Sequence, residues 1–344
     1  MNIRHPLRLM LPATTTSPSG KAAHPPPAIE RLPSEWIEAI EHLLGEGAVM
    51  PSVRPHPVLH HGIPLWRVPV RWPVPNGTLT LLLHATTDGS PDYVIARHAT
   101  RHRVPIMPRL YHVHRCTGTQ VILLLEDPGD HELPADWLHH TRLRDAVATW
   151  LGHAAGQHVR ALRANSWRNG VIVRQRVERW GHTICQAVRQ GAPWLCELTL
   201  EAVRFLSRQH AALVRRLAPH SLWLVHGDLR PEHMRLTPSG VVAFHWHRAG
   251  YGPLPLDVWD LVWHLPDREA WEGMVLFSSL LSPDLRRSFT RPLIQLTGAI
   301  KALERLARAA RLWTTGVGAI RGEATHEGER AAHRLVAWAE QRPP

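Results

Sequence analysis

The residues best suited to chemistry lie close together in one part of the chain. His226 and Asp228 follow a short apolar run, and His233, His245 and His247 come soon after them. Imidazoles exchange protons near neutral pH and bind transition metals, whereas carboxylates accept protons and bind hard cations. The chain holds 26 histidines. Their gathering here by chance, as ordinary polar side chains, is therefore an alternative that the sequence leaves open.

The stretch from Ser221 to Leu261 carries an ordered series of motifs. It reads SLWLVHGDLRPEHMRLTPSGVVAFHWHRAGYGPLPLDVWDL. The series of HGDL, proline, a Pro-Ser-Gly turn, tryptophan and Ala-Gly-Tyr-Gly resembles the aminoglycoside phosphotransferase/choline kinase group of small-molecule kinases. Val121–Asp127 and Trp150–Ala155 are similar to the family's hinge strand and the helix after it. The resemblance implies a two-lobed, protein-kinase-like α+β fold, with a small antiparallel β N-lobe and a large α-helical C-lobe.

The resemblance implies roles for three residues. Phosphoryl transfer to a hydroxyl is mostly positioning and charge neutralisation, by a lysine on the phosphates, metal held by Asn and Asp, and an aspartate that accepts the hydroxyl proton. Asp228 matches that proton acceptor. His226 matches a residue that braces the same loop, and Asp260 matches an aspartate that supports it.

The other parts of this machinery are substituted. The only lysines are Lys21 and Lys301, both outside the predicted N-lobe strands, and no asparagine follows Asn169. His233 and His245 stand where the family has its metal-binding Asn and Asp. Imidazole is a poor ligand for magnesium and a good one for zinc and later transition metals. The two histidines are therefore candidate ligands of a transition metal, together with the loop aspartate, or polar cleft residues that donate to phosphate or carboxylate.

Arg97 and Glu126 are the candidate contacts of a nucleotide such as ATP. Tyr93–Arg97 is predicted as the strand that carries the family's lysine, and a guanidinium can grip phosphate. Alternation along a strand turns only one of Ala96 and Arg97 toward the cleft, and the alignment favours Ala96. Glu126 lies in the hinge segment.

Two further expectations concern the surroundings of these residues. His245 and His247 alternate on a predicted strand, so both should face one side and His247 should support the site. The stretch after Arg97 looks too short for the family's glutamate-bearing helix, which is then moved, with Glu38 or Glu41 as candidates, or lost.

Composition narrows the class of protein. A net charge of +11 attracts phosphate, nucleic acid or acidic partners, but no basic run is interleaved with aromatic residues, so we do not expect nucleic-acid binding as the main function. The sequence contains no run of about 18 apolar residues, so we do not expect a membrane span. Three cysteines without pattern predict free thiols and a cytoplasmic protein.

The chain is predicted to divide into three parts. Residues 1–33 form a flexible Pro-rich tail, residues 34–126 an N-lobe of one helix and an antiparallel sheet, and residues 127–344 a helical C-lobe with its catalytic-loop region at 221–263. A helix is expected from Ser34 to Gly45, and Asn76-Gly77 predicts a hairpin turn. Helical periodicity predicts further helices at 137–157, 167–189, 197–217, 271–281, 292–313 and 327–339.

Two main hypotheses remain open, and the sequence leaves the enzyme status undecided. The first is a degenerate, pseudokinase-like member that binds a small molecule, a peptide or a partner protein. The second is an active ATP-dependent phosphotransferase on a small-molecule or peptide hydroxyl, with Asp228 as base and an altered metal site. A third, a basic RNA or DNA binder, predicts salt-sensitive binding that does not depend on Asp228.

Overall fold

The computed structural model describes residues 34–46, 48–49, 56–60, 63–71, 78–116, 118–316 and 318–340. The predicted tail and the Asn76-Gly77 turn lie outside this part of the chain. The chain forms two compact units, Met1–Trp137 with Pro231–His247, and Leu138–Arg230 with Arg248–Pro344. This division differs from the predicted limits of 34–126 and 127–344, because a hairpin from late in the chain belongs to the first unit.

The first unit is built on an antiparallel sheet of the kind the sequence predicts. Its strands run in the order β1-β2-β3-β5-β4, and each neighbouring pair is antiparallel. Consecutive apolar residues of β3 and β5 are buried, Leu81 to Leu83 and Val121 to Leu125, as expected for strands covered on both faces. The strands are β1 (His56–His60), β2 (Ile63–Arg71), β3 (Thr78–Thr87), β4 (Leu110–Arg115) and β5 (Gln120–Glu126).

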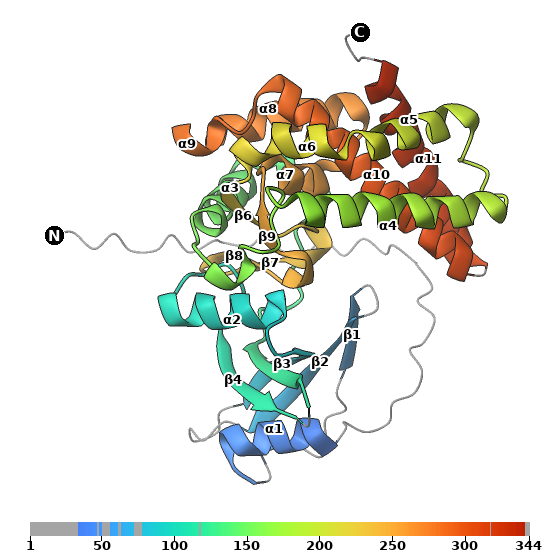
Figure 1. Ribbon diagram of the computed structural model, residues 1–344. Helices are drawn as coiled ribbons and strands as arrows, with labels where there is room; N and C mark the ends of the chain where they lie inside the picture. The colour runs from blue at the N-terminus through green and yellow to red at the C-terminus, as the bar shows by residue number, and fades with distance from the viewer. Residues whose placement is uncertain are drawn as a thin grey trace. The chain divides into compact units, whose positions relative to one another are not determined.

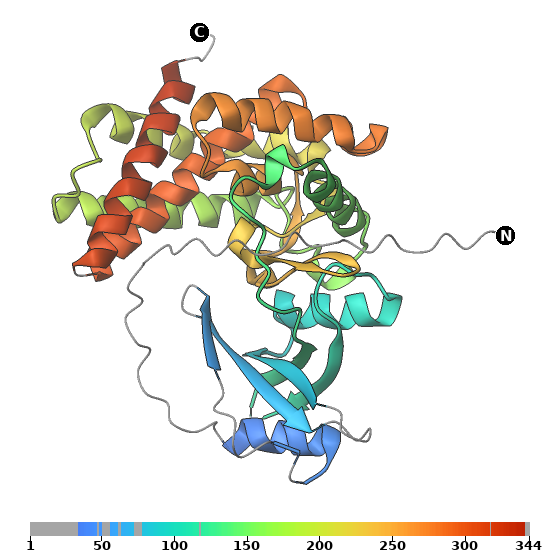
Figure 2. The same ribbon diagram turned by 180° about the vertical axis from the view of Figure 1, so that it is seen from behind.

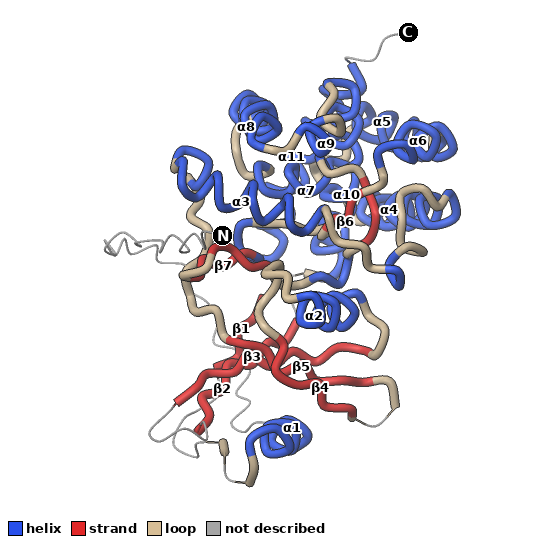
Figure 3. Tube along the Cα trace, turned by 90° about the vertical axis from the view of Figure 1, so that its left-hand side faces the viewer, coloured by secondary structure: helices blue, strands red, loops and turns tan. Residues whose placement is uncertain are grey.

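Two helices cover this sheet, one on each face (Figures 1 and 3). The predicted first helix, α1 (Ser34–Leu44), packs Trp36 and Ile40 into a core with Leu81 and Leu83 of β3. Because side chains alternate along a strand, Leu82 and His84 point to the other face. That face carries α2 (Pro91–His102), which contacts β3 and β4.

The helix α2 corrects a sequence prediction. Tyr93–Arg97 is not a strand but the first half of this helix, which Ser90 caps by accepting a hydrogen bond from the Tyr93 amide. Pro91 at its first position and Asp92 in its first turn are both typical of helix starts. A helix is therefore present between the third and fourth strands, and it carries Asp92 but no glutamate.

A second hairpin completes the first unit. A 3-10 turn at Pro231–His233 leads into β7 (Met234–Thr237), which pairs antiparallel with β8 (Gly240–Ala243) through the predicted Pro-Ser-Gly turn. The β8 strand ends before His245, and Trp246–Arg248 forms another 3-10 turn. His245 and His247 therefore do not alternate on a strand as predicted: His245 is buried and His247 is exposed.

The second unit is helical, with one short two-stranded sheet of β6 (Trp223–Val225) and β9 (Gly250–Gly252). The hairpin of α10 and α11 packs side by side and is prominent in Figure 2. The predicted helix 197–217 is broken at Gln209 into two. The helices are α3 (Thr141–Ala155), α4 (Gly170–Arg189), α5 (Glu197–Arg208), α6 (His210–Leu217), α7 (Pro255–Val262), α8 (Asp267–Leu280), α9 (Pro283–Arg286), α10 (Arg291–Thr315) and α11 (Ala319–Glu340).

Two class expectations can be compared with this structure. In the part of the chain that the structure describes, no helix has both the length and the apolar character needed to span a bilayer. Cys116, Cys185 and Cys196 are free thiols, as predicted.

Candidate functional site

The loop that carries Asp228 follows β6 in the second unit, and we call residues 226–230 the Asp228 loop. Gly227 has a φ of +84°, and a Cβ there would lie 2.6 Å from the carbonyl oxygen of Arg248, so no other residue fits without a backbone shift. The Nδ1 atom of His226 accepts a hydrogen bond from the Asp228 amide at 3.3 Å. The His226 side chain thus forms a hydrogen bond with the backbone of the loop to which it belongs.

Direct support of this loop from α7 comes from Asp257, a residue that sequence reasoning missed. Its two carboxylate oxygens accept hydrogen bonds from the backbone amides of His226, at 2.7 Å, and Gly227, at 2.8 Å. Burial raises the pKa of the Asp257 carboxyl to about 7, against the opposite effect of the two amide donors. Asp257 lies three residues before the predicted Asp260, on the same face of α7, and helical spacing was the signal that could have suggested it.

The Asp228 carboxylate is held by Arg230. The Nε atom of Arg230 lies 2.8 Å from Oδ1, and Nη2 lies 2.9 Å from Oδ2, which makes the pair bidentate. Both side chains are buried, with about 8% of each exposed. Such a pair is among the stronger charge-assisted contacts in proteins, so it fixes the carboxylate in one orientation.

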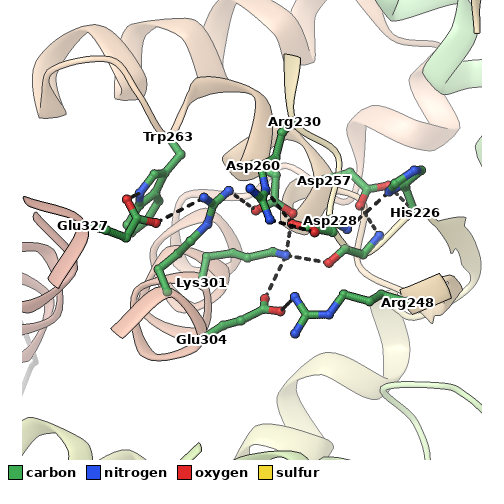
Figure 4. A network of polar contacts seen from close by, with 12 residues as sticks. His226, Asp228, Arg230, Arg248, Asp257, Asp260, Trp263, Lys301, Glu304 and Glu327 are labelled. Atoms are coloured by element: carbon green, nitrogen blue, oxygen red, sulfur yellow. Dashed lines mark hydrogen bonds and ion pairs between the residues drawn. The ribbon is translucent and has the colours of Figure 1, made fainter. Parts of the chain in front are cut away.

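Asp260 takes part in a buried ion network instead of contacting the loop amides (Figure 4). Its two oxygens accept hydrogen bonds from Lys301 Nζ, at 2.6 Å, and Arg305 Nη2, at 2.9 Å. Lys301 also donates to the Gly227 carbonyl oxygen at 3.1 Å, so Asp260 supports the loop through this lysine. Burial works against the charge on Lys301, but Asp260 and Glu304 outweigh it and raise the lysine's pKa.

The network extends to both sides of Lys301. Glu304 accepts from Lys301 at 2.9 Å and pairs with Arg248, while Glu327 pairs with Arg305 at 3.2 Å. Burial raises the pKa of the Glu304 carboxyl, but Arg248 and Lys301 reverse this and hold it below its usual value. The lysine that the sequence places deep in the C-terminal helices therefore reaches the Asp228 loop.

The two predicted metal-binding histidines meet in the first unit. The ring centres of His233 and His245 lie 4.9 Å apart, nearly edge to face, and both side chains are buried. His245 adopts a φ of +61°, a left-handed conformation that is uncommon outside glycine. Backbone of this kind is found more often at functional sites than elsewhere.

His84 of β3 joins this pair, and sequence reasoning missed it. Its ring centre lies 6.3 Å from that of His245, and its Nε2 lies 3.8 Å from Oδ1 of Asp92 in α2. His84 lies on the third strand of the sheet, and Asp92 lies on the helix that follows it. We call His84, His233 and His245 the histidine group.

A metal site was sought among the side chains that the structure describes. Among the described residues, no group of three or more His, Cys, Asp or Glu side chains is arranged to hold a metal. The predicted site of two histidines with Asp228 joins residues of both units. It stays a prediction.

The remaining predicted residues lie at the surface. Arg97 is exposed on α2 and donates to the Tyr93 hydroxyl at 3.0 Å, while Ala96 beside it is buried. Glu126 ends β5 with an exposed side chain, and its amide donates to the Arg109 carbonyl oxygen. His84 lies on the third strand, whereas Arg97 lies on α2.

Comparison with known proteins supports the fold of the chain but not a particular activity. No family model matches the chain, and no curated protein matches its sequence. Solved structures do match. A choline kinase from Cryptosporidium parvum has a TM-score of 0.60 at 11% identity, over 89% of this chain and 94% of that one.

Two other solved structures extend the match. A choline/ethanolamine kinase family protein from Mesorhizobium loti has a TM-score of 0.55 at 14% identity, over 90% of this chain and all of that one. An aminoglycoside phosphotransferase mutant in complex with ADP and hygromycin B has a TM-score of 0.53 at 11% identity, over 88% and 97%. The chain has the fold of these kinases. The fold expectation drawn from its motifs is confirmed.

Proposed function

We propose that this chain is a ligand-binding protein with the fold of aminoglycoside phosphotransferases and choline kinases that does not transfer phosphoryl groups from magnesium-ATP. The observation that carries this proposal is the histidine group. The rings of His84, His233 and His245 lie together. In this proposal they replace the lysine and the two oxygen ligands for magnesium that the mechanism uses.

The chemistry of the substitutions argues against ordinary phosphoryl transfer. The reaction depends on positive charge that meets the charge developing on the phosphoryl oxygens. Magnesium dehydrates reluctantly and prefers oxygen ligands, so two imidazoles are a poor replacement for an amide and a carboxylate. An imidazole is also charged only when protonated, whereas lysine carries its charge throughout the physiological range.

The second unit supports a different candidate, an active phosphotransferase with an altered metal site. The Asp228 loop keeps its glycine, its amide contacts to Asp257 and its carboxylate. Arg230 brings a permanent positive charge beside Asp228 that could partly replace a metal. In this alternative Asp228 is the base, and Asp228→Asn abolishes transfer.

The fold also suggests what kind of ligand to test. Solved structures with this fold hold ADP with hygromycin B, and GDP with kanamycin. We propose a small hydroxylated molecule as the ligand, and ATP is the nucleotide to test first. A peptide or a partner protein is the alternative ligand. Free thiols agree with a cytoplasmic setting.

Calorimetric titration with ATP tests the proposal. The titration is run without metal and then with magnesium, manganese and zinc, beside a His233→Ala/His245→Ala double variant. We expect no tightening by magnesium. Tightening by zinc that the double variant loses would favour the active alternative and make the two histidines metal ligands. Tight magnesium-dependent binding by the wild type would overturn the proposal.

A further inference from the structure

Arg176 is a half-buried cation of α4 without an acidic partner. Its Nη2 donates to Oδ1 of Asn165 at 2.5 Å, and its guanidinium carbon lies 5.0 Å from the centre of the Trp167 ring. Throughout the described residues, no carboxylate forms an ion pair with it. Its positive charge is therefore met by one amide oxygen and one aromatic face.

Neighbouring charged groups leave the positive charge of Arg176 only partly balanced. Burial is the largest effect and lowers the pKa of Arg176, and nearby Arg248 and Arg179 lower it further. Glu304 is the one acid that opposes them, and it is already paired with Arg248 and Lys301. Arg176 is half-buried and has no ion-pair partner among the described residues, so its guanidinium can donate hydrogen bonds to an incoming anion.

The neighbouring ion network does not supply that anion. Every carboxylate in it already has a basic partner in the second unit. The pairs are Asp228 with Arg230, Asp260 with Lys301 and Arg305, Glu304 with Lys301 and Arg248, and Glu327 with Arg305.

A continuous set of contacts connects Arg176 to the Asp228 loop. Asn165, which holds the guanidinium, donates to the Ala249 carbonyl oxygen at 2.5 Å and accepts from the Tyr251 amide at 3.0 Å. A Cβ on Gly250 would lie 1.9 Å from the Asn165 carbonyl oxygen, so the two segments touch backbone to backbone. Arg248, one residue before Ala249, packs its backbone on Gly227. Arg176 is therefore connected to the Asp228 loop through Asn165 and the segment 248–251.

We propose that Arg176 binds the carboxylate or phosphate of an anionic, hydroxylated small molecule beside the Asp228 loop. The planar guanidinium, already fixed by Asn165 and Trp167, suits bidentate binding of either group. This inference rests on the proposed function and names its ligand class. Choline and kanamycin are cations at neutral pH, whereas the ligand inferred from Arg176 is an anion.

A charge series on one sugar scaffold tests the inference on the full chain. Glucose 6-phosphate, glucuronate, glucose and glucosamine are titrated calorimetrically at low ionic strength, with inorganic phosphate and acetate as minimal anions. We expect at least one anionic sugar to bind about tenfold or more tighter than glucose, and glucosamine to bind no better than glucose. The stronger of the two anionic sugars identifies phosphate or carboxylate.

Variants on the same helix locate the binding. Arg176→Gln should weaken the anionic sugar about tenfold or more, and Arg176→Lys should weaken it less. Arg174→Gln, an exposed neighbour paired with Glu178, should leave it unchanged. Binding that does not depend on ligand charge, binding that survives in Arg176→Gln, or no anion binding at all would each overturn the inference. Because no measurement here involves ATP, its failure is separate from that of the proposed function.

Discussion

The Asp228 loop and the histidine group differ in how far their residues match those of the kinases that the sequence resembles. In the loop, the residues to which the resemblance assigns roles in phosphoryl transfer are bonded into a buried network through Asp257, Arg230 or Lys301. In the histidine group, we propose that imidazoles have replaced the residues that the reaction needs, on the strand β3 and beside the hairpin of β7 and β8. The comparison teaches that a retained aspartate is weak evidence of catalysis when the fold itself depends on its surroundings.

The largest effect should follow from removing the centre of the loop's network. Asp260→Ala leaves Lys301 and Arg305 buried without their shared partner, and loss of one member of a buried ion pair costs about 3–5 kcal/mol of unfolding free energy. Urea unfolding measures this. The exposed pair of Arg268 and Glu272 is the control, and Glu272→Ala should leave the midpoint unchanged. Equal effects of both changes would contradict the claim that the buried network around Asp260 stabilises the fold.

The next effect concerns the pH dependence of stability. Burial raises the pKa of Asp257 to about 7, so the folded chain holds a proton that the unfolded chain releases near about pH 4. The stabilisation from this proton is complete below about pH 4 and is lost as the pH rises to about 7. Wild-type stability should therefore fall by a few kcal/mol across this window relative to Asp257→Asn, as measured by urea unfolding at several pH values. A constant difference between the two proteins would contradict the raised pKa.

A smaller effect tests the histidine group directly. His233→Asn/His245→Asp returns oxygen ligands to the two positions, so magnesium should tighten ATP binding about tenfold in this variant and not in the wild type. His247→Asp is the matched control, since His247 is exposed two residues from His245. Equal magnesium effects in the variant and the control would mean that loss of the oxygen ligands is not what separates this chain from active kinases.

The smallest effect is expected at Arg97. Because its side chain lies at the surface of α2, Arg97→Ala should change the unfolding free energy by no more than about 0.5 kcal/mol and leave any ATP binding unaltered. Thermal unfolding and the same titration measure both quantities. Weaker nucleotide binding in this variant would return Arg97 to the role that the sequence suggested for it.

The fold could be predicted from the sequence largely because the motifs from Ser221 to Leu261 are long and ordered. The site could not be predicted to the same extent. Tyr93–Arg97 is apolar and β-branched enough to suggest a strand, but Ser90 and Pro91 start a helix there, a cap signal that outweighs propensity. This error placed Arg97 on a strand, whereas it lies on α2 and is exposed.

Other site residues carried no local signal at all. Lys301 reaches the Asp228 loop from a helix more than seventy residues later, a contact that only the packing of α10 determines. Arg176 is one arginine among many in a basic chain, and its lack of an acidic partner is visible only in three dimensions. Asp257 is the exception, because its spacing from Asp260 on one helix face could have suggested it.

Phosphoryl transfer itself tests the central claim most directly. Wild type and Asp228→Asn are incubated with magnesium-ATP and a panel of hydroxylated acceptors, both cationic and anionic, and the release of ADP and the phosphorylated products are measured. We predict that the two proteins give the same background rate with every acceptor. Product formation by the wild type that Asp228→Asn abolishes would contradict the account and establish the chain as an active phosphotransferase.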